Sequence, residues 1–353
     1  MTDAARPLTR LGFLTIGLFD PADPSGGHES TLRIIELGEQ LGFDSAWLRD
    51  RHLQYGISSP VAVLAAATQR TSRIELGTAV IPLGLENPFR LAEDLSTVDV
   101  LSGGRLNPGV SVGPPMHYDA LKEHLYPDSW AAENFTYERV ERLLAAVRGD
   151  AMSTFEGTQG IETFSTSIQP HAAGLIDRIW YGAGSLSSAA WAGEHGLNLL
   201  SSSVIKAEED DDFARIQAAQ IALFRSKHPL GEAARASQGL VVIPTDTATP
   251  EQRAKYHAYA ESRFARTTSP QGPARMLFAP DIVGSSEQLA DALRAHAGFC
   301  SVDEVVFALP FSFEHDDYVQ ILTDMATRLG PLLGWSPRPS PSSHPSPSPS
   351  SHR

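Results

Sequence analysis

The stretch from Ile74 to Gly113, IELGTAVIPLGLENPFRLAEDLSTVDVLSGGRLNPGVSVG, decides the fold that we expect for this chain. Its apolar beginning, residues 74–81, predicts a strand. Pro88 then opens an amphipathic helix, which Ser102–Gly104 ends, and residues 106–112 predict a second apolar strand. Two buried strands joined by a helix form a βαβ unit. Sheets built from such units are parallel and bind ligands at the carboxyl ends of their strands.

The same order of strand and helix is repeated along the chain. Apolar strand patterns occur at 11–19, 44–48, 74–81, 106–112, 178–181, 197–201, 240–243 and 304–309. Helical patterns occur at 28–41, 60–69, 88–101, 186–195, 208–227, 251–263 and 314–333. Strands that alternate with helices in this way favour an α/β fold, the (β/α)8 TIM barrel, over an open doubly wound sheet.

Two segments depart from the alternation. Residues 114–177 form an insertion after strand 4 that is too long for a simple connection, and within it 136–147 predict a helix and 162–168 a strand. The Pro- and Ser-rich segment 336–353 has too little apolar surface to offset the entropy of ordering, so we expect a disordered C-terminal tail. We therefore expect one barrel domain over residues 1–335.

The composition limits the class of protein. A chain of 353 residues, 42% of them hydrophobic, can bury the core of such a barrel. Its net charge of −14 argues against nucleic acid or an anionic membrane surface as a partner. The single cysteine, Cys300, suits a reducing compartment, and neither a signal peptide nor a membrane-spanning apolar run is recognisable. We therefore expect a soluble, cytoplasmic protein.

Four motifs at the predicted strand ends carry a family resemblance. They are Gly42–Trp47 running into Asp50–His52, Leu76–Val80, Pro88–Asp94 with Leu101–Leu106, and Tyr181–Ser185. With these motifs the chain, from about Leu11 to Gly334, resembles the luciferase-like flavin-dependent monooxygenase and reductase superfamily. The resemblance implies a (β/α)8 barrel that binds a reduced flavin at its carboxyl-terminal mouth, and this cofactor is FMN or the deazaflavin F420.

The end of strand 3 is one part of the implied site. By resemblance, Thr78, Ala79 and Val80 lie under the isoalloxazine ring, often with a cis non-prolyl peptide, which here would fall between Ala79 and Val80. The alternative is an ordinary barrel strand, because Thr-Ala-Val is unremarkable by itself.

The turn after strand 5 is the implied phosphate site. Gly182 and Gly184 let backbone amides approach an anion, the following helix N-terminus favours negative charge, and Ser185 or Ser188 can donate hydroxyl hydrogen bonds. A helix cap is one alternative. A dinucleotide fingerprint is another, but the next strand ends in Ser201–Ser203, where that fingerprint needs an acidic residue.

The end of strand 2, Asp50-Arg51-His52, departs from the family pattern. The family often has an acid followed by two histidines there, so Arg51 replaces the histidine implicated in chemistry at the flavin. Arg51 cannot act as a base, because its guanidinium stays protonated, but it can pair with an anionic reduced flavin or a substrate oxyanion. His52 can titrate near neutral pH. The alternatives are a structural hydrogen bond for His52 and an ion pair with Asp50 or Glu93 for Arg51.

Two further positions bear on the cofactor. Val112 stands where some relatives have an arginine that meets the flavin phosphate, so the charge of that phosphate must be neutralised elsewhere. Arg90 and Glu93 share a helix face, and we expect a buried ion pair between helix and barrel, although the family places the glutamate on the cofactor side.

The insertion after strand 4 supplies candidate substrate contacts. An insertion at a barrel mouth is a usual source of lid residues, and this one is rich in aromatic and histidine side chains, which suit an organic substrate or a local core. They are Met116, His117, Tyr118, His124, Tyr126 and Trp130.

These observations lead to one expected function and several alternatives. No metal-binding, nucleophile-elbow or Walker motif is present, so we expect no metal. The resemblance implies a two-component monooxygenase that uses reduced FMN, oxygen, a separate flavin reductase and a small organic substrate, and that forms a homodimer. The alternatives are an F420-dependent hydride-transfer enzyme, a non-catalytic flavin-binding partner subunit and, more remotely, a hydrolase or aldolase on the same barrel.

Overall fold

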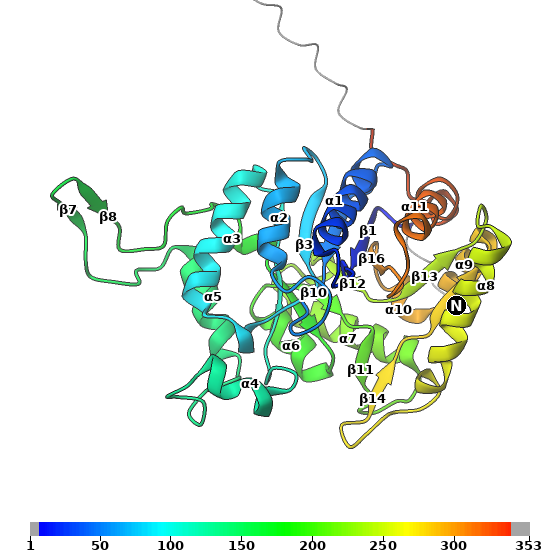
Figure 1. Ribbon diagram of the computed structural model, residues 1–353. Helices are drawn as coiled ribbons and strands as arrows, with labels where there is room; N and C mark the ends of the chain where they lie inside the picture. The colour runs from blue at the N-terminus through cyan, green and yellow to red at the C-terminus, as the bar shows by residue number, and fades with distance from the viewer. Residues whose placement is uncertain (1–6, 340–353) are drawn as a thin grey trace, which may run out of the picture.

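A computed structural model describes residues 7–339 and shows an α/β barrel whose strands are surrounded by helices (Figure 1). The barrel strands are β1 (Arg10–Thr15), β2 (Ser45–Leu48), β3 (Glu75–Thr78), β4 (Ile81–Pro82), β5 (Leu106–Asn107), β6 (Gly109–Ser111), β9 (Trp180–Ala183), β10 (Asn198–Ser201), β12 (Ala236–Gln238), β13 (Val241–Pro244) and β16 (Glu304–Ala308). All pairs between them are parallel, as expected for repeated βαβ units.

The pairings run round a ring. β16 pairs with β1, β1 with β2, β2 with β3 and β3 with β5. Only Pro108 separates β5 from β6, and β6 pairs with β9, β9 with β10 and β10 with β12. β13 follows β12 in the chain and pairs with β16, the strand with which the series began, at Val241 and Ala308. The sequence-based prediction of a (β/α)8 TIM barrel is confirmed.

The outer layer consists of helices that follow the strands. They are α1 (Pro24–Gln40), α2 (Pro60–Thr68), α3 (Pro88–Ser102), α6 (Leu186–Glu194), α7 (Phe213–Lys227), α8 (Pro250–Phe264), α9 (Ser286–Arg294), α10 (Ala297–Cys300), α11 (His315–Asp324) and α12 (Gly330–Leu332). Short 3-10 helices are η1 (Leu83–Leu85), η2 (Ile176–Arg178), η3 (Gly231–Ala233) and η4 (Ala265–Thr267), and the π-helix η5 (Met325–Leu329) joins α11 to α12. α3 begins at Pro88 and ends before Gly103, which adopts the left-handed conformation (φ 72°) that a side chain disfavours. None of the helices within residues 7–339 combines the length and apolarity that a bilayer crossing requires.

The insertion after β6 contains two helices and a hairpin. α4 (Tyr118–Leu125) and α5 (Glu138–Arg148) lie next to the barrel, and the antiparallel hairpin of β7 (Gly157–Gln159) and β8 (Glu162–Phe164) projects away from it (Figure 1). The strand predicted at 162–168 is therefore shorter and pairs only within this hairpin.

Other strand boundaries also differ from the prediction. The strand predicted at 11–19 ends at Thr15, and strand 7 begins with β12, which the sequence reading missed because its short Ala-Ser-Gln run has no apolar pattern. β15 (Asp281–Gly284) adds to β13, and β11 (Val204–Lys206) pairs with β14 (Met276–Phe278).

The start of the predicted tail is ordered. The Arg338 amide donates to the Gly42 carbonyl, and Arg338 Nε lies 2.5 Å from Oδ1 of buried Asp44. A buried carboxylate needs such a partner, so residues 336–339, the beginning of the predicted tail, are held against the barrel. The remainder of the predicted tail, 340–353, lies outside the described residues.

A group of ion pairs fills the amino-terminal end of the barrel. Arg235 Nη2 lies 2.7 Å from Glu304 Oε1 and 3.2 Å from Glu75 Oε2, and Arg10 contacts the same two carboxylates. The Arg235 guanidinium also lies over the Trp180 ring, 4.8 Å from its centroid. Above it, Trp180 and Trp47 meet edge to face at 5.3 Å.

The buried hydrophobic side chains form two separate clusters. The large one lies between the helices and the outer faces of the strands, and the small one, of Trp47, Trp180, Leu200 and Val306, lies inside the barrel. Leu14, Ala79 and Val80 are only partly buried against the small cluster, so the barrel interior is closed by charges at one end and apolar but open at the other.

We expect Glu304→Gln to lower the free energy of unfolding by about 3 kcal/mol. The Glu304 side chain is only 4% exposed, and the substitution removes part of the negative charge that neutralises Arg10 and Arg235. Urea denaturation at pH 7 measures this loss. Asp211→Asn removes an ion pair to Arg275 in which both side chains are more than half exposed, and we expect it to change stability by about 0.5 kcal/mol or less. An equal loss in the two variants would contradict the role of the Glu304 network.

Candidate active site

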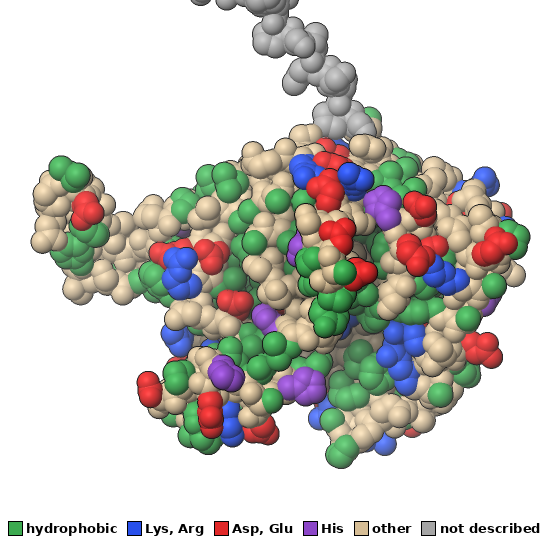
Figure 2. Space-filling model, viewed as in Figure 1, with side chains coloured by type: hydrophobic (Ala, Val, Ile, Leu, Met, Phe, Trp, Pro, Cys, Tyr) green, Lys and Arg blue, Asp and Glu red, His purple; other side chains and the backbone are tan. Residues whose placement is uncertain are grey.

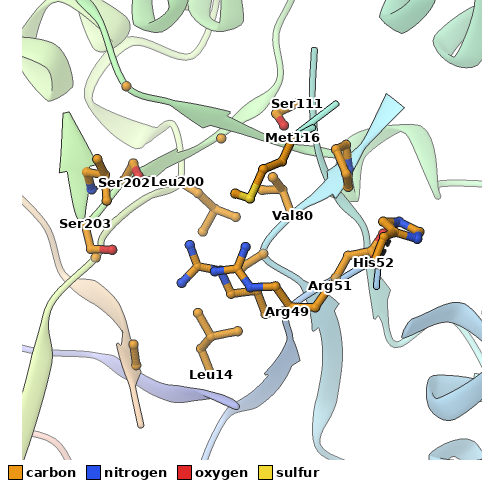
Figure 3. A pocket seen from close by; sticks show the side chains of 18 of the residues that line it. Leu14, Arg49, Arg51, His52, Val80, Ser111, Met116, Leu200, Ser202 and Ser203 are labelled. Atoms are coloured by element: carbon orange, nitrogen blue, oxygen red, sulfur yellow. Dashed lines mark hydrogen bonds and ion pairs between the residues drawn. The ribbon is translucent and has the colours of Figure 1, made fainter. Parts of the chain in front are cut away.

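A cavity of about 540 Å³ opens at the carboxyl ends of the strands (Figure 3). Its walls come from the ends of β1, β2, β6, β9, β10, β12 and β16, from the residues between β3 and β4, and from the start of the insertion. The site therefore lies where the βαβ unit at 74–113 predicts ligand binding. Its base is the open end of the small apolar cluster, formed by Leu14, Ala79, Val80, Leu200 and Val306.

The predicted cofactor residues at the end of β3 reach this cavity in part. Ala79 and Val80 line it, and the peptide between them is cis, as the family resemblance implied. Thr78 is fully buried instead, where its hydroxyl donates to the Gly109 carbonyl and accepts from the Gly109 amide. Thr78 thus joins β3 to β6 beneath the cavity.

Gly182 is required for close packing at the cavity wall. A Cβ atom built on Gly182 would lie 2.8 Å from Cγ1 of Val80, closer than side chains tolerate. Gly182 and Gly184 both line the cavity. The absence of side chains therefore keeps this wall flat beside Val80.

Ser185 and Ser188 form a helix cap rather than an open anion site. The Ser185 hydroxyl accepts from the Ser188 amide at 3.2 Å, and the Ser188 hydroxyl accepts from the Ser185 amide at 3.0 Å, a capping box at the start of α6. The next amide, of Leu186, donates to Glu208 Oε2 at 2.7 Å. A carboxylate thus already occupies the position at which an anion binds a helix N-terminus.

His52 and Asp50 form a pair at the end of β2. His52 Nε2 lies 3.3 Å from Oδ1 of Asp50, whose side chain is fully buried. The interaction with the Asp50 carboxylate raises the pKa of His52, burial lowers it, and the charges of Asp50 and Glu86 raise it further. The net direction is upward, so the protonated imidazole is favoured. This contact is an ion pair and not the structural hydrogen bond considered for His52, because His52 Nε2 and both Asp50 carboxylate oxygens have no hydrogen-bond partner within residues 7–339. His52 also lines the cavity.

Arg51 has neither of the two ion pairs considered for it. Within residues 7–339 no carboxylate oxygen lies within 4.0 Å of its guanidinium. Burial lowers the pKa of Arg51, and the charge of Asp50 opposes this shift. Figure 3 shows Arg51 together with Arg49 pointing into the cavity between Leu14 and Val80.

Arg49 is the clearest functional candidate that the sequence reading missed. Burial lowers the pKa of Arg49 to about 10, and the positive charges of Arg51, Arg263 and Arg266 act in the same direction. No carboxylate pairs with Arg49 in the described part of the chain. The sequence feature that could have identified Arg49 is its position at a strand end, one residue before the Asp50-Arg51-His52 motif.

Gln238 is a second missed residue. It is 1% exposed, it lines the cavity, and neither its Oε1 nor its Nε2 has a hydrogen-bond partner within residues 7–339. Buried amides are normally satisfied, so this one is ready to bind a ligand. It lies on β12, the strand that the sequence reading did not detect.

The remaining sequence-based expectations have mixed outcomes. Arg90 pairs with Glu93, but on the surface, since the Arg90 side chain is 62% exposed, so the prediction of a buried pair is wrong. Neither residue lines the cavity. Of the residues singled out in the insertion, Met116 and His117 line it, whereas Tyr126 donates to the Gly84 carbonyl at 2.8 Å and supports the loop. No group of three potential metal ligands occurs between residues 7 and 339.

The comparison with protein families gives a broad match. A family model for luciferase-like monooxygenases matches residues 9–298. Limonene 1,2-monooxygenase from Rhodococcus erythropolis is 36% identical over 128 residues, 35% of this chain and 33% of that protein. F420-dependent glucose-6-phosphate dehydrogenase from Nocardia farcinica is 32% identical over 203 residues, 55% of this chain and 58% of that protein. The chain spans about half or less of the length of the curated relatives that it matches.

Solved structures share the fold. Monooxygenase RslO1 from Streptomyces bottropensis superimposes with a TM-score of 0.70 at 20% identity, over 92% of this chain and 99% of that one. The oxygenating constituent of 3,6-diketocamphane monooxygenase from Pseudomonas putida, in complex with FMN, gives a TM-score of 0.62 at 14% identity, over 94% and 100% of the two chains.

We expect nuclear magnetic resonance titration of the His52 imidazole to give a pKa above its ordinary value of about 6.5, because the Asp50 carboxylate stabilises the protonated ring. In Asp50→Asn this pKa should fall below the ordinary value, since burial is then opposed only by the weaker effect of the Glu86 charge. Glu86→Gln, which removes a weaker contribution, serves as the matched control and should lower the pKa less. An unchanged pKa in Asp50→Asn would show that the pair does not control His52.

Proposed function

Because this chain belongs to the luciferase-like monooxygenase family, we propose that it is a flavin-dependent oxidoreductase that binds reduced FMN in the cavity at the barrel mouth. The observation that carries the proposal is the cavity itself. Its apolar base of Ala79, Val80 and Leu200 suits a planar aromatic ring, and the buried amide of Gln238 supplies an unused donor and an unused acceptor.

The residues present fit a flavin in three respects. Gly182 leaves room beside Val80 where a Cβ would collide, so a flat ring can lie against this wall. Arg51 can neutralise the negative charge of a reduced flavin, because it has no carboxylate partner within 4.0 Å in the described chain. A phosphate at the start of α6 would replace the Glu208 carboxylate at the Leu186 amide, and this helix N-terminus would then supply the contribution of the arginine missing at Val112.

When bound, reduced FMN supplies the electrons with which oxygen is activated for insertion into an organic substrate. The chain contributes the surroundings of that reaction. Leu14, Val80 and Met116 form apolar walls that exclude water. The imidazole of His52, when protonated, can donate a proton to a developing oxyanion through Nδ1, the ring nitrogen that does not face Asp50, and Asp50 favours the charged form of the ring.

Two alternatives have specific support. The similarity to an F420-dependent dehydrogenase over 203 residues favours F420 as the other cofactor, with hydride transfer and no use of oxygen. Arg51 at the position of the family's histidine favours a non-catalytic flavin-binding subunit. In the monooxygenase we propose that a separate reductase supplies the reduced flavin and that the protein acts as a cytoplasmic homodimer.

We expect the purified protein to bind reduced FMN and to consume oxygen with it in the presence of small organic substrates. Calorimetric titration with FMN, reduced FMN, F420 and reduced F420, followed by oxygen consumption, tests this. Binding of F420 without binding of either FMN form would favour the hydride-transfer alternative. Binding of reduced FMN without turnover by this chain alone would favour the non-catalytic subunit.

We also expect Glu208→Ala to bind FMN roughly fivefold more tightly, because it frees the Leu186 amide and removes a like charge worth about 1 kcal/mol at a helix N-terminus. Affinity for riboflavin, which lacks the phosphate, should not change. Glu209→Ala, which removes the adjacent exposed carboxylate, is the matched control. If FMN and riboflavin respond equally, the phosphate does not bind at the start of α6.

A further inference from the structure

Four arginines lie close together in a chain whose net charge is −14, and two of them, Arg49 and Arg51, line the cavity. Arg49 and Arg51 come from the end of β2, and Arg263 and Arg266 come from the end of α8 and from η4. All four lie close enough for their charges to act on Arg49. Figure 2 shows this face hollowed near its centre, with basic side chains along one border of the hollow.

Counter-charges are scarce around these arginines. Arg263 pairs with Asp281 at 2.5 Å, whereas Arg266 lies over the Phe278 ring, 4.6 Å from its centroid. Within residues 7–339 neither Arg49 nor Arg51 has an ion pair. The nearby carboxylate of Asp50 already contacts His52.

An unpaired and desolvated guanidinium is costly to a fold, so its retention in a cavity indicates a ligand that supplies the missing charge. Arg49 lies 5.8 Å from the centroid of the Phe311 ring and is otherwise directed into the cavity (Figure 3). The surfaces beside it, Leu14, Met116 and Val80, are apolar. The partner that fits both features is an anion on an apolar body.

We propose that this cavity is a binding site for an organic carboxylate, whose charged group is held by Arg49 and whose apolar part lies against Leu14 and Met116, while Arg51 remains the partner of the flavin. Organic carboxylates are then the substrate class of the proposed oxidoreductase, and this assignment rests on the proposed function. Arg263 and Arg266 attract the anion to the mouth. The phosphate of the cofactor is also an anion, so the test distinguishes binding of a carboxylate from binding of the cofactor phosphate.

The probe pair is octanoate and 1-octanol, which share an apolar chain and differ in charge. Calorimetry measures both affinities on the protein without cofactor and on the protein loaded with FMN. We expect octanoate to bind at least tenfold more tightly than 1-octanol, and Arg49→Gln to abolish this difference. Arg49→Lys keeps the positive charge and should retain part of the difference in affinity. Arg275→Gln removes an exposed arginine and is the matched control, expected to leave the difference unchanged.

The outcomes are distinguishable. Equal affinity for octanoate and 1-octanol on a protein that binds FMN would overturn the carboxylate site and leave the oxidoreductase function unaffected. Arg49-dependent octanoate binding on a protein that binds neither FMN nor F420 would support the anion site and refute the oxidoreductase function. A loss of affinity in Arg49→Gln that is confined to FMN, with riboflavin and octanoate unchanged, would assign Arg49 to the cofactor phosphate and overturn the proposal.

Discussion

The ion-pair network of Arg10, Glu75, Arg235 and Glu304 is the constraint on which the rest of the structure depends. Arg10, Glu75 and Glu304 begin β1, β3 and β16, and Arg235 directly precedes β12, so their charges are neutralised only when these four strands lie together. Burial of the Glu304 carboxylate would be unfavourable without both arginines. The network therefore closes the amino-terminal end of the barrel and leaves the carboxyl end as the site for a ligand.

The same separation of charge and apolar surface continues along the barrel axis. Arg235 lies over Trp180, Trp180 meets Trp47, and above them Leu200 and Val306 lead to the base of the cavity. A ring that binds there meets apolar side chains from below, while polar groups such as Gln238 meet it from the wall. This arrangement gives a flat ligand both burial and a defined orientation.

The insertion after β6 is anchored by another buried arginine. Arg139, 6% exposed, donates to the Leu83 and Glu86 carbonyls and pairs with Glu133. These contacts tie α5 to the loop between β4 and α3, beside the cavity wall that Met116 and His117 complete. The insertion thus contributes both a fixed support and the residues that cover the mouth.

The sequence by itself determined the barrel, because the alternation of strand and helix patterns is local information that every βαβ unit repeats. Resemblance to the family also identified Ala79–Val80 and Gly182 as cavity residues. It could not identify Arg49 or Gln238. The importance of Arg49 comes from the lack of an ion pair to it among residues 7–339. That of Gln238 comes from two buried side-chain atoms without a hydrogen-bond partner in the same part of the chain, and both features depend on residues distant in the chain.

The helix start at Ser185 illustrates the same limit. Its glycines and serines are typical of a phosphate site and of a helix cap, and local sequence does not distinguish the two. Tertiary structure decided that the serines cap each other and that Glu208, 22 residues from Leu186, accepts from the next amide. Periodicity is a property of neighbours along the chain, whereas the pairing of charges and hydrogen bonds is a property of neighbours in space, so only the folded structure could assign it.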